Sequence, residues 1–160
     1  MRRVTTGRPP VKDPQPPLGR ALGFMKLLWA LAHGLESTSK RMHASLGVTG
    51  PQRLVLRLVG HYGTMSAGEL ARTLHIHPSS LTGMLRRLES NGFIERESHP
   101  EDGRRAVLSL TAKGQRLNQK NGGTVESLVE RALRSIPERD LRAAQRALQT
   151  LAAEFDREDS

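Results

Sequence analysis

The sequence predicts a mainly α-helical fold that carries one small antiparallel β-hairpin. Apolar residues recur at helical spacing through most of the chain. Capping motifs, in which a Ser or Thr is followed three residues later by Glu or Gln, precede several of these apolar runs. Residues 93–110 instead combine strand-forming residues with a central turn. These patterns, with a length of 160 residues, favour one domain with helical extensions.

The composition narrows the classes of function. The formal net charge is +9, which is typical of proteins that bind a polyanion, although charge does not distinguish DNA from RNA or acidic lipid. The absence of cysteine excludes disulfides, cysteine-ligated metals and thiol-based catalysis or redox sensing. The sequence shows no signal peptide and no apolar run of about 18 residues, so we expect a cytoplasmic protein without a membrane partner.

The chain opens with a basic, proline-rich segment, residues 1–17, which we predict to be a disordered arm. This arm is either a simple tail or a segment that reaches DNA or a second copy of the chain. Residues 18–48 follow as a predicted long helix, whose apolar stripe includes Phe24 and Leu28.

Two capping motifs predict the next two helices. A T-x-x-Q motif lies at residues 49–52 and an S-x-x-E motif at residues 66–69. The polar side of the first of these helices would carry Arg53 and Arg57. We predict that both helices belong to one unit that spans residues 49–114.

The following helix would begin at Pro78 and end at Gly92. One face carries an apolar stripe predicted to be buried: Leu81, Met84, Leu85 and Leu88. The opposite face carries residues that are small, hydroxylated or basic: Ser79, Ser80, Thr82, Gly83, Arg86 and Arg87. A plain solvated face is the alternative, but small residues in the first half of the helix favour close approach to the major groove of DNA.

A strand–turn–strand pattern follows this helix. Residues 93–98 and 105–110 are the predicted strands. Three residues of the second strand would share one face: Ala106, Leu108 and Leu110. In the loop, Asp102 and Gly103 would shape the turn, and Arg104 would reach into the minor groove. Over residues 49–114 the order of elements is that of a helix-turn-helix followed by a β-hairpin wing, which predicts a DNA-binding unit.

The remaining residues, 115–160, predict helices that join two copies of the chain. Thr111 would cap a helix that runs to about Ser135, and Ser135 with Glu138 would cap a last helix with a heptad-like seam. We expect a two-fold homodimer. The residues expected in its interface are Phe24, Leu28, Leu141, Leu148, Leu151 and Phe155. The alternative is that these helices pack only within their own copy.

Four short motifs occur in order along the chain. They are the run at residues 46–52, Leu88-Glu89-x-x-Gly92-Phe93-Ile94, Asp102-x-Arg104 and Leu110-Thr111-x-x-Gly114. Their order and spacing resemble the MarR family of bacterial winged helix-turn-helix regulators over about residues 20–155. The resemblance implies that the first and last helices form a dimer that represses a promoter. Pro78 and Gly83 depart from the family, which often has a polar or basic residue there.

Two winged units on a two-fold axis would read an inverted repeat with half-sites about one helical turn apart. The residues expected to contact phosphate or sugar are Ser66, Arg72, Arg86, Arg87 and Arg105. Those expected to read bases or a groove are Ser79, Ser80, Thr82 and Arg104. Gly83 would permit close approach to the DNA, and His77 is either the helix cap or a phosphate donor.

The resemblance also implies a crevice for a small aromatic or anionic effector that releases the DNA. The residues that would line it are Trp29, His33, Arg57, His61 and Met65, and ordinary packing or solvation is the alternative for each. One branch of the family senses peroxides through a cysteine, which this sequence lacks.

Other classes of site find no support in the sequence. The six histidines show no metal-ligand spacing, so we expect no metal and no other cofactor. No catalytic motif indicates an enzyme. The alternative function is a winged-helix module that activates transcription, or that binds protein or RNA instead of an operator.

Overall fold

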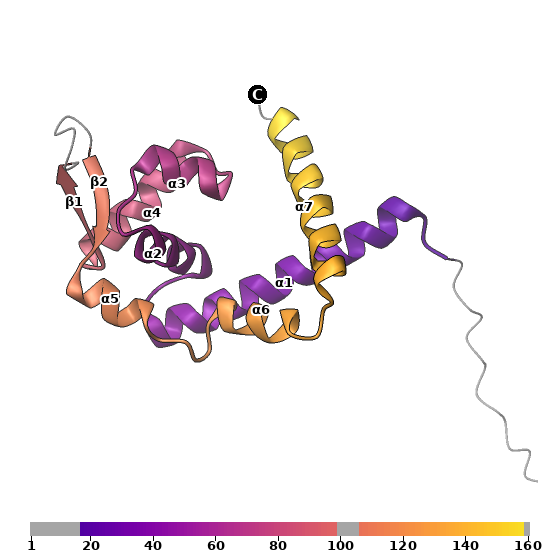
Figure 1. The fold of residues 1–160 in the computed structure, drawn as a ribbon, viewed down its shortest axis with the longest axis horizontal. Helices are drawn as coiled ribbons and strands as arrows, with labels where there is room; N and C mark the ends of the chain where they lie inside the picture. Colours follow the sequence, from indigo (N-terminus) through magenta and orange to yellow (C-terminus); the bar gives the residue numbers. More distant parts are fainter. Residues whose placement is uncertain (1–16, 99–105, 159–160) are drawn as a thin grey trace, which may run out of the picture. The chain divides into compact units, whose positions relative to one another are not determined.

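The computed structural model describes residues 17–98 and 106–158, which are mainly helical with one small sheet (Figure 1). The elements follow in the order α1 (Arg20–Leu46), α2 (Gly50–Tyr62), α3 (Ala67–Leu74), α4 (Pro78–Ser90), β1 (Ile94–Ser98), β2 (Ala106–Leu110), α5 (Ala112–Asn118), α6 (Val125–Leu133) and α7 (Glu138–Glu158). The predicted fold class is therefore confirmed. The predicted arm lies outside the described residues, except for its last residue, Pro17.

The chain divides into two structural units, residues 1–33 and residues 34–160. The described part of the first unit is the N-terminal portion of α1 and the residues just before it. Its large apolar side chains are exposed to solvent, among them Leu27 at 67% and Trp29 at 70%. Nothing within this portion of α1 covers them.

Side-chain caps start the helices of the winged unit, by which we mean α2 to α5 with the hairpin between α4 and α5. Thr49 Oγ1 accepts a hydrogen bond from Gln52 N (3.4 Å), and Gln52 Oε1 accepts one from Thr49 N (2.9 Å). Ser66 and Glu69 form the same reciprocal pair at the start of α3. Both predicted capping boxes are confirmed, and each satisfies backbone N–H groups that have no partner within the helix.

The hydrophobic core lies mostly within the winged unit. The core side chains with the least exposure are Met42, Val48, Val55, Leu56, Val59, Leu70, Leu81, Leu85, Leu88, Ile94 and Leu108. The predicted stripe of α4 is buried at three of its four positions, while Met84 is half-buried. Each fully buried leucine contributes about 2 kcal/mol of transfer free energy. Packing along this stripe therefore fixes which face of α4 points outward.

The two strands form an antiparallel hairpin that runs from the pair Ile94 and Leu110 to the pair Ser98 and Ala106. The predicted face of Ala106, Leu108 and Leu110 is not the only buried side of β2. Ala106 is exposed, whereas Val107 and Leu108 are both buried. Neighbouring strand residues point to opposite faces of a sheet, so both faces are covered at this position.

Two close approaches attach this hairpin to the helices. Met65 N donates to Leu108 O (3.2 Å) and Leu108 N donates to Met65 O (2.8 Å), which ties the segment between α2 and α3 to β2. At the other end, a Cβ atom on Gly114 would collide with the carbonyl oxygen of Phe93. Glycine therefore allows α5 to pack against the start of the hairpin.

The prediction of one helix from Thr111 to about Ser135 is wrong. Thr111 does cap a helix, but α5 ends at Asn118 and α6 starts only at Val125. Between them Gly123 has a φ of 72°, a conformation that favours glycine. Thr124 then caps α6, accepting a hydrogen bond from Ser127 N (3.3 Å).

The predicted capping box of the last helix is also wrong. The hydroxyl of Ser135 donates to the carbonyl of Ala132 at the end of α6 (2.8 Å) instead of serving α7. Helix α7 begins at Glu138, directly after Pro137, whose carbonyl accepts a hydrogen bond from Leu141 N (3.0 Å).

Arg53 is a further correction, because it does not lie on an exposed polar side of α2. Its side chain is 1% exposed, the largest of the fully buried side chains. Arg57, one turn later, is half-buried.

Among the described residues, no helix has the length and hydrophobicity that crossing a membrane requires.

Candidate nucleic-acid interface and the adjoining cavity

The outward face of α4 has the character that the sequence predicts for a recognition surface. Its hydroxylated and basic side chains are exposed, namely Ser79, Ser80, Thr82, Arg86 and Arg87. Gly83 on the same face is half-buried. The hydroxyl of Thr82 donates to Pro78 O (2.9 Å), so its lone pairs and its methyl group remain for contacts outside the helix. Its fixed rotamer suits it to present those groups in one direction.

His77 is the N-cap of α4. Its Nδ1 accepts a hydrogen bond from Ser79 N (3.3 Å) and lies 2.7 Å from Ser79 Oγ. Of the two roles predicted for His77, the structure places it in the cap. Because Nδ1 accepts from the backbone, the neutral ring would carry its proton on Nε2.

The two predicted contacts on α3 differ in their surroundings. Ser66 Oγ donates to Glu69 Oε2 (2.7 Å) and accepts from Glu69 N (3.2 Å), so its hydrogen is used within the cap. A phosphate contact by this hydroxyl would compete with Glu69. Arg72, in the last turn of α3, is exposed.

The wing residues of the prediction lie outside the described residues: Asp102, Gly103, Arg104 and Arg105. The two strands that lead to them are described up to Ser98 and from Ala106.

Two basic residues that the sequence analysis did not single out connect α4 to the hairpin and α5. Arg96 on β1 pairs with Glu89 in the last turn of α4. Lys113 on α5 donates to Asn91 O (2.7 Å) and lies 4.7 Å from the centre of the Phe93 ring. The partners in each pair lie on different elements, so the packing of the hairpin and of α5 against the end of α4 brings them together.

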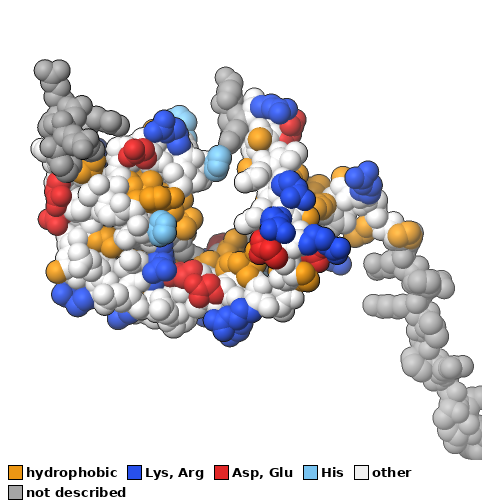
Figure 2. Space-filling view, viewed as in Figure 1, with side chains coloured by type: hydrophobic (Ala, Val, Ile, Leu, Met, Phe, Trp, Pro, Cys, Tyr) orange, Lys and Arg blue, Asp and Glu red, His pale blue; other side chains and the backbone are white. Residues whose placement is uncertain are grey.

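A cavity of about 670 Å³ adjoins α4. Its wall is mostly apolar and comes from α1, α2, α3, α4, α6 and the turns between them: Leu35, Glu36, Ser39, Gly50, Pro51, Leu54, Arg57, Leu74, Ile76, Met84, Val125, Glu126 and Val129. In Figure 2 hydrophobic side chains gather over α3 and α4, the two helices that supply Leu74 and Met84 to this wall. The volume is in the range of small-molecule sites.

Of the five residues predicted to meet an effector, Arg57 lines this cavity. Met65 is buried in the core and His61 is exposed at the end of α2. Trp29 and His33 are exposed on α1. Arg57 Nη1 donates to the carbonyl of Asn118 (3.0 Å), and its Nε lies 4.0 Å from Glu126 Oε1.

The residues predicted for a dimer interface are exposed or half-buried. Phe24 is 42% exposed, Leu148 47% and Phe155 66%. Leu28, Leu141 and Leu151 are half-buried.

Within residues 17–98 and 106–158, no three His, Cys, Asp or Glu side chains cluster as metal ligands would.

Comparison with known proteins shows which chains are similar to this one. Residues 48–106 match the family model described as the MarR family. An organic hydroperoxide resistance transcriptional regulator of Bacillus subtilis is 33% identical over 94 residues, which are 59% of this chain and 64% of the relative, so the match spans less than two thirds of that relative. The uncharacterised HTH-type transcriptional regulator ML2140 of Mycobacterium leprae is 32% identical over 111 residues, 64% of this chain and 78% of the relative.

Among solved structures, the S. aureus MepR–DNA complex has a similar fold. Its TM-score is 0.66 at 17% identity, and the match covers 82% of this chain and 97% of that one. At this identity the likeness concerns the fold alone.

Proposed function

The chain belongs to the MarR family of transcriptional regulators, and from that membership we propose that it is a sequence-specific DNA-binding repressor. In this proposal it acts as a homodimer on an inverted-repeat site in a promoter. The observation that carries the proposal is the outward face of α4, where small hydroxyl residues and arginines are exposed above three buried leucines. Because the buried stripe holds α4 in place, this face is presented in a fixed orientation to DNA.

The roles on DNA follow from the chemistry of each side chain. Ser79, Ser80 and Thr82 lie at the N-terminal end of α4, where recognition helices meet base edges in the major groove. Their hydroxyls donate or accept, and the Thr82 methyl suits a thymine methyl. Arg72, Arg86 and Arg87 would contact phosphates, as would Arg105, while Arg104 on the wing would enter the minor groove.

Dimerisation is supported by the apolar side chains that the terminal helices expose. Phe155 and Leu148 on α7 and Phe24 on α1 remain 66%, 47% and 42% exposed in one copy of the chain. Pairing of two copies about a two-fold axis would bury them and set two α4 helices at one separation. A similar protein, the S. aureus regulator MepR, has been solved with DNA.

Regulation by a small aromatic or anionic effector is supported by the cavity. Its apolar wall would hold an aromatic ring, and the Arg57 guanidinium would pair with a carboxylate or phenolate. Such a ligand would release DNA only by binding more tightly to the arrangement of the dimer that has the lower DNA affinity. With no cysteine in the sequence, the proposal contains no thiol oxidation step.

The test begins by selecting DNA sites from a random pool with the purified protein. We expect an enriched inverted repeat, bound selectively over scrambled DNA of equal length with a steep dependence on salt. A transcription assay on a promoter carrying the enriched site should then show less product. More product would mean activation, and equal weak binding to all DNAs would favour the alternative of a protein- or RNA-binding module.

A further inference from the structure

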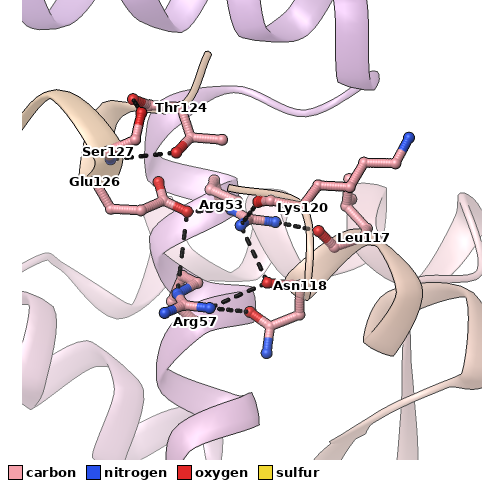
Figure 3. Close-up of polar contacts among 8 residues, drawn as sticks. All are labelled: Arg53, Arg57, Leu117, Asn118, Lys120, Thr124, Glu126 and Ser127. Carbon is pink, nitrogen blue, oxygen red and sulfur yellow. Dashed lines mark hydrogen bonds and ion pairs between the residues drawn. The ribbon is translucent and has the colours of Figure 1, made fainter. Parts of the chain in front are cut away.

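The buried side chain of Arg53 on α2 contacts two neighbouring segments that lie far from α2 in the sequence (Figure 3). Its Nε donates to Glu126 Oε1 on α6 (2.6 Å). Its Nη1 donates to the carbonyl of Leu117, and its Nη2 donates to the carbonyls of Asn118 (3.2 Å) and Lys120 (2.6 Å). A side chain of α2 therefore contacts both the end of α5 and the start of α6.

The carbonyls that Arg53 contacts lie at the C-terminal end of α5 and just beyond it, where they have no partner inside the helix, although Leu117 O also accepts from Lys120 N (3.1 Å). Leu117 and Asn118 are the last two residues of α5, and Lys120 follows that helix. These groups carry the negative end of the helix dipole, which favours a cation. Arg53 thus caps the C-terminus of α5 from a different helix, while its Nε donates to the carboxylate of Glu126.

A second arginine contacts the same two segments. Arg57 Nη1 donates to the backbone carbonyl of Asn118 (3.0 Å) and lies 3.3 Å from its side-chain oxygen. Arg57 Nε lies 4.0 Å from the same Oε1 atom of Glu126 that Arg53 contacts. Glu126 therefore faces both arginines with one oxygen, and we call the group formed by Arg53, Arg57, Asn118 and Glu126 the arginine clasp.

The arginine clasp connects the two sides of a glycine-containing segment between α5 and α6. Between α5 and α6 lie Gly122 and Gly123, the latter at a φ of 72°, and residues 121–124 belong to no helix. Two glycines give this connection many accessible conformations. The direction in which α6 and α7, the C-terminal arm, leave the winged unit must therefore be fixed by contacts across the connection, and the clasp supplies hydrogen bonds on both sides of it.

Because the Arg53 guanidinium is buried, its hydrogen bonds require accurately placed acceptors. A buried guanidinium is stable only when its donors are satisfied, so displacement of α6 from Arg53 leaves an unpaired charge in the interior. An apolar contact would tolerate a range of helix positions, whereas the planar fork of arginine meets its acceptors in one arrangement. The clasp thus favours a single direction of the C-terminal arm.

We propose that Arg53, through Glu126, is a positioning residue that sets the half-site spacing accepted by the dimer. The inference rests on the proposed function, because the predicted dimer residues of α7 lie on the C-terminal arm and the recognition face lies on α4. Arg53 contacts no DNA in this proposal. It fixes the arm to the winged unit, and the dimer then holds two α4 helices at one separation.

The test compares Glu126→Ala, which removes the carboxylate from α6, with Glu126→Gln, which keeps an acceptor oxygen. Glu130→Ala is the matched control, because Glu130 is exposed on the same helix and its removal changes the net charge equally. Each protein is titrated with the selected inverted repeat, with repeats whose spacer is one or two base pairs longer or shorter, and with a single half-site.

We expect wild type, Glu126→Gln and Glu130→Ala to prefer the selected spacing by about tenfold or more, a size typical of coupling between sites. Glu126→Ala should bind the half-site like Glu130→Ala while its spacing preference falls to about threefold or less. Arg53→Met should show the same loss if it folds, as judged by its circular dichroism and thermal unfolding.

Two results would overturn the inference. In the first, Glu126→Ala keeps the wild-type preference for spacing. In the second, it weakens half-site and full-site binding by the same factor, which would indicate general damage. A wild-type protein that prefers no spacing at all would instead refute the proposed function, so the two failures are distinguishable.

Discussion

The winged unit and helix α7 both carry apolar stripes, but only the winged unit buries its stripe within one copy of the chain. In the winged unit, α4 contacts α2, α3 and β1, and its Leu88 is 0% exposed. On α7, no side chain that the structure describes is buried, and Phe155 is 66% exposed. Both regions carry apolar residues at helical spacing. The same apolar pattern therefore forms an internal core in the winged unit, whereas on α7 we propose that it contacts a second copy of the chain.

The largest effect should come from the internal core. Leu88→Ala should lower the free energy of unfolding by about 3 kcal/mol, because it removes a fully buried side chain and leaves a cavity. Urea denaturation monitored by circular dichroism measures this. Leu54→Ala is the control, since Leu54 is 49% exposed and loses fewer contacts. Equal losses in the two variants would mean that the stripe of α4 is not the centre of the core.

The second largest effect should separate the copies without unfolding them. Leu148→Glu places a charge in the proposed seam of α7, so we expect monomers by analytical ultracentrifugation. Loss of bivalent binding should then weaken affinity for the inverted repeat about a hundredfold and leave half-site binding unchanged. Gln149→Glu adds the same charge one residue away and should have little effect. A Leu148→Glu protein that stays dimeric would place the interface elsewhere.

The contrast between regions also explains what the sequence could predict. The capping boxes at Thr49 and Ser66 depend on residues three apart, so they were predicted correctly. The outward face of α4 depends on helical periodicity alone, and its exposure was also predicted correctly.

The features that the sequence analysis missed depend on distant residues. The burial of Arg53 depends on Glu126, which lies 73 residues away, and a lone arginine on α2 gives no sign of that partner. The break between α5 and α6 does have a local signal, the Gly122-Gly123 pair, which the prediction of one helix from Thr111 to about Ser135 did not use. The cavity wall draws on five helices, so of the predicted effector residues only Arg57 was placed on it.

A smaller effect should concern the choice of sequence. Thr82→Ala removes a methyl group and a hydroxyl from the exposed face of α4 without touching the core. We expect discrimination between the selected site and single-base variants to fall about tenfold at one position of each half-site, with binding to unrelated DNA unchanged. Competition binding with a panel of point-mutated sites measures this. Thr73→Ala, an exposed threonine on α3, is the control, and an equal fall for all DNAs would remove Thr82 from base recognition.

The smallest effect should appear only in the response to salt. Arg87 is exposed on the outward face of α4, and Arg87→Ala should weaken binding to selected and unrelated DNA by the same few-fold factor. A dimer would lose two phosphate contacts, so the slope of log K against log salt should fall by about 1.8. Arg116→Ala removes an equal charge from an exposed position on α5 and should leave this slope nearly unchanged. An equal change for both variants would mean that net charge acts without a specific contact. A slope change of about 0.9 would mean that one copy of α4 binds at a time, and the exposed seam of α7 would then need a different partner.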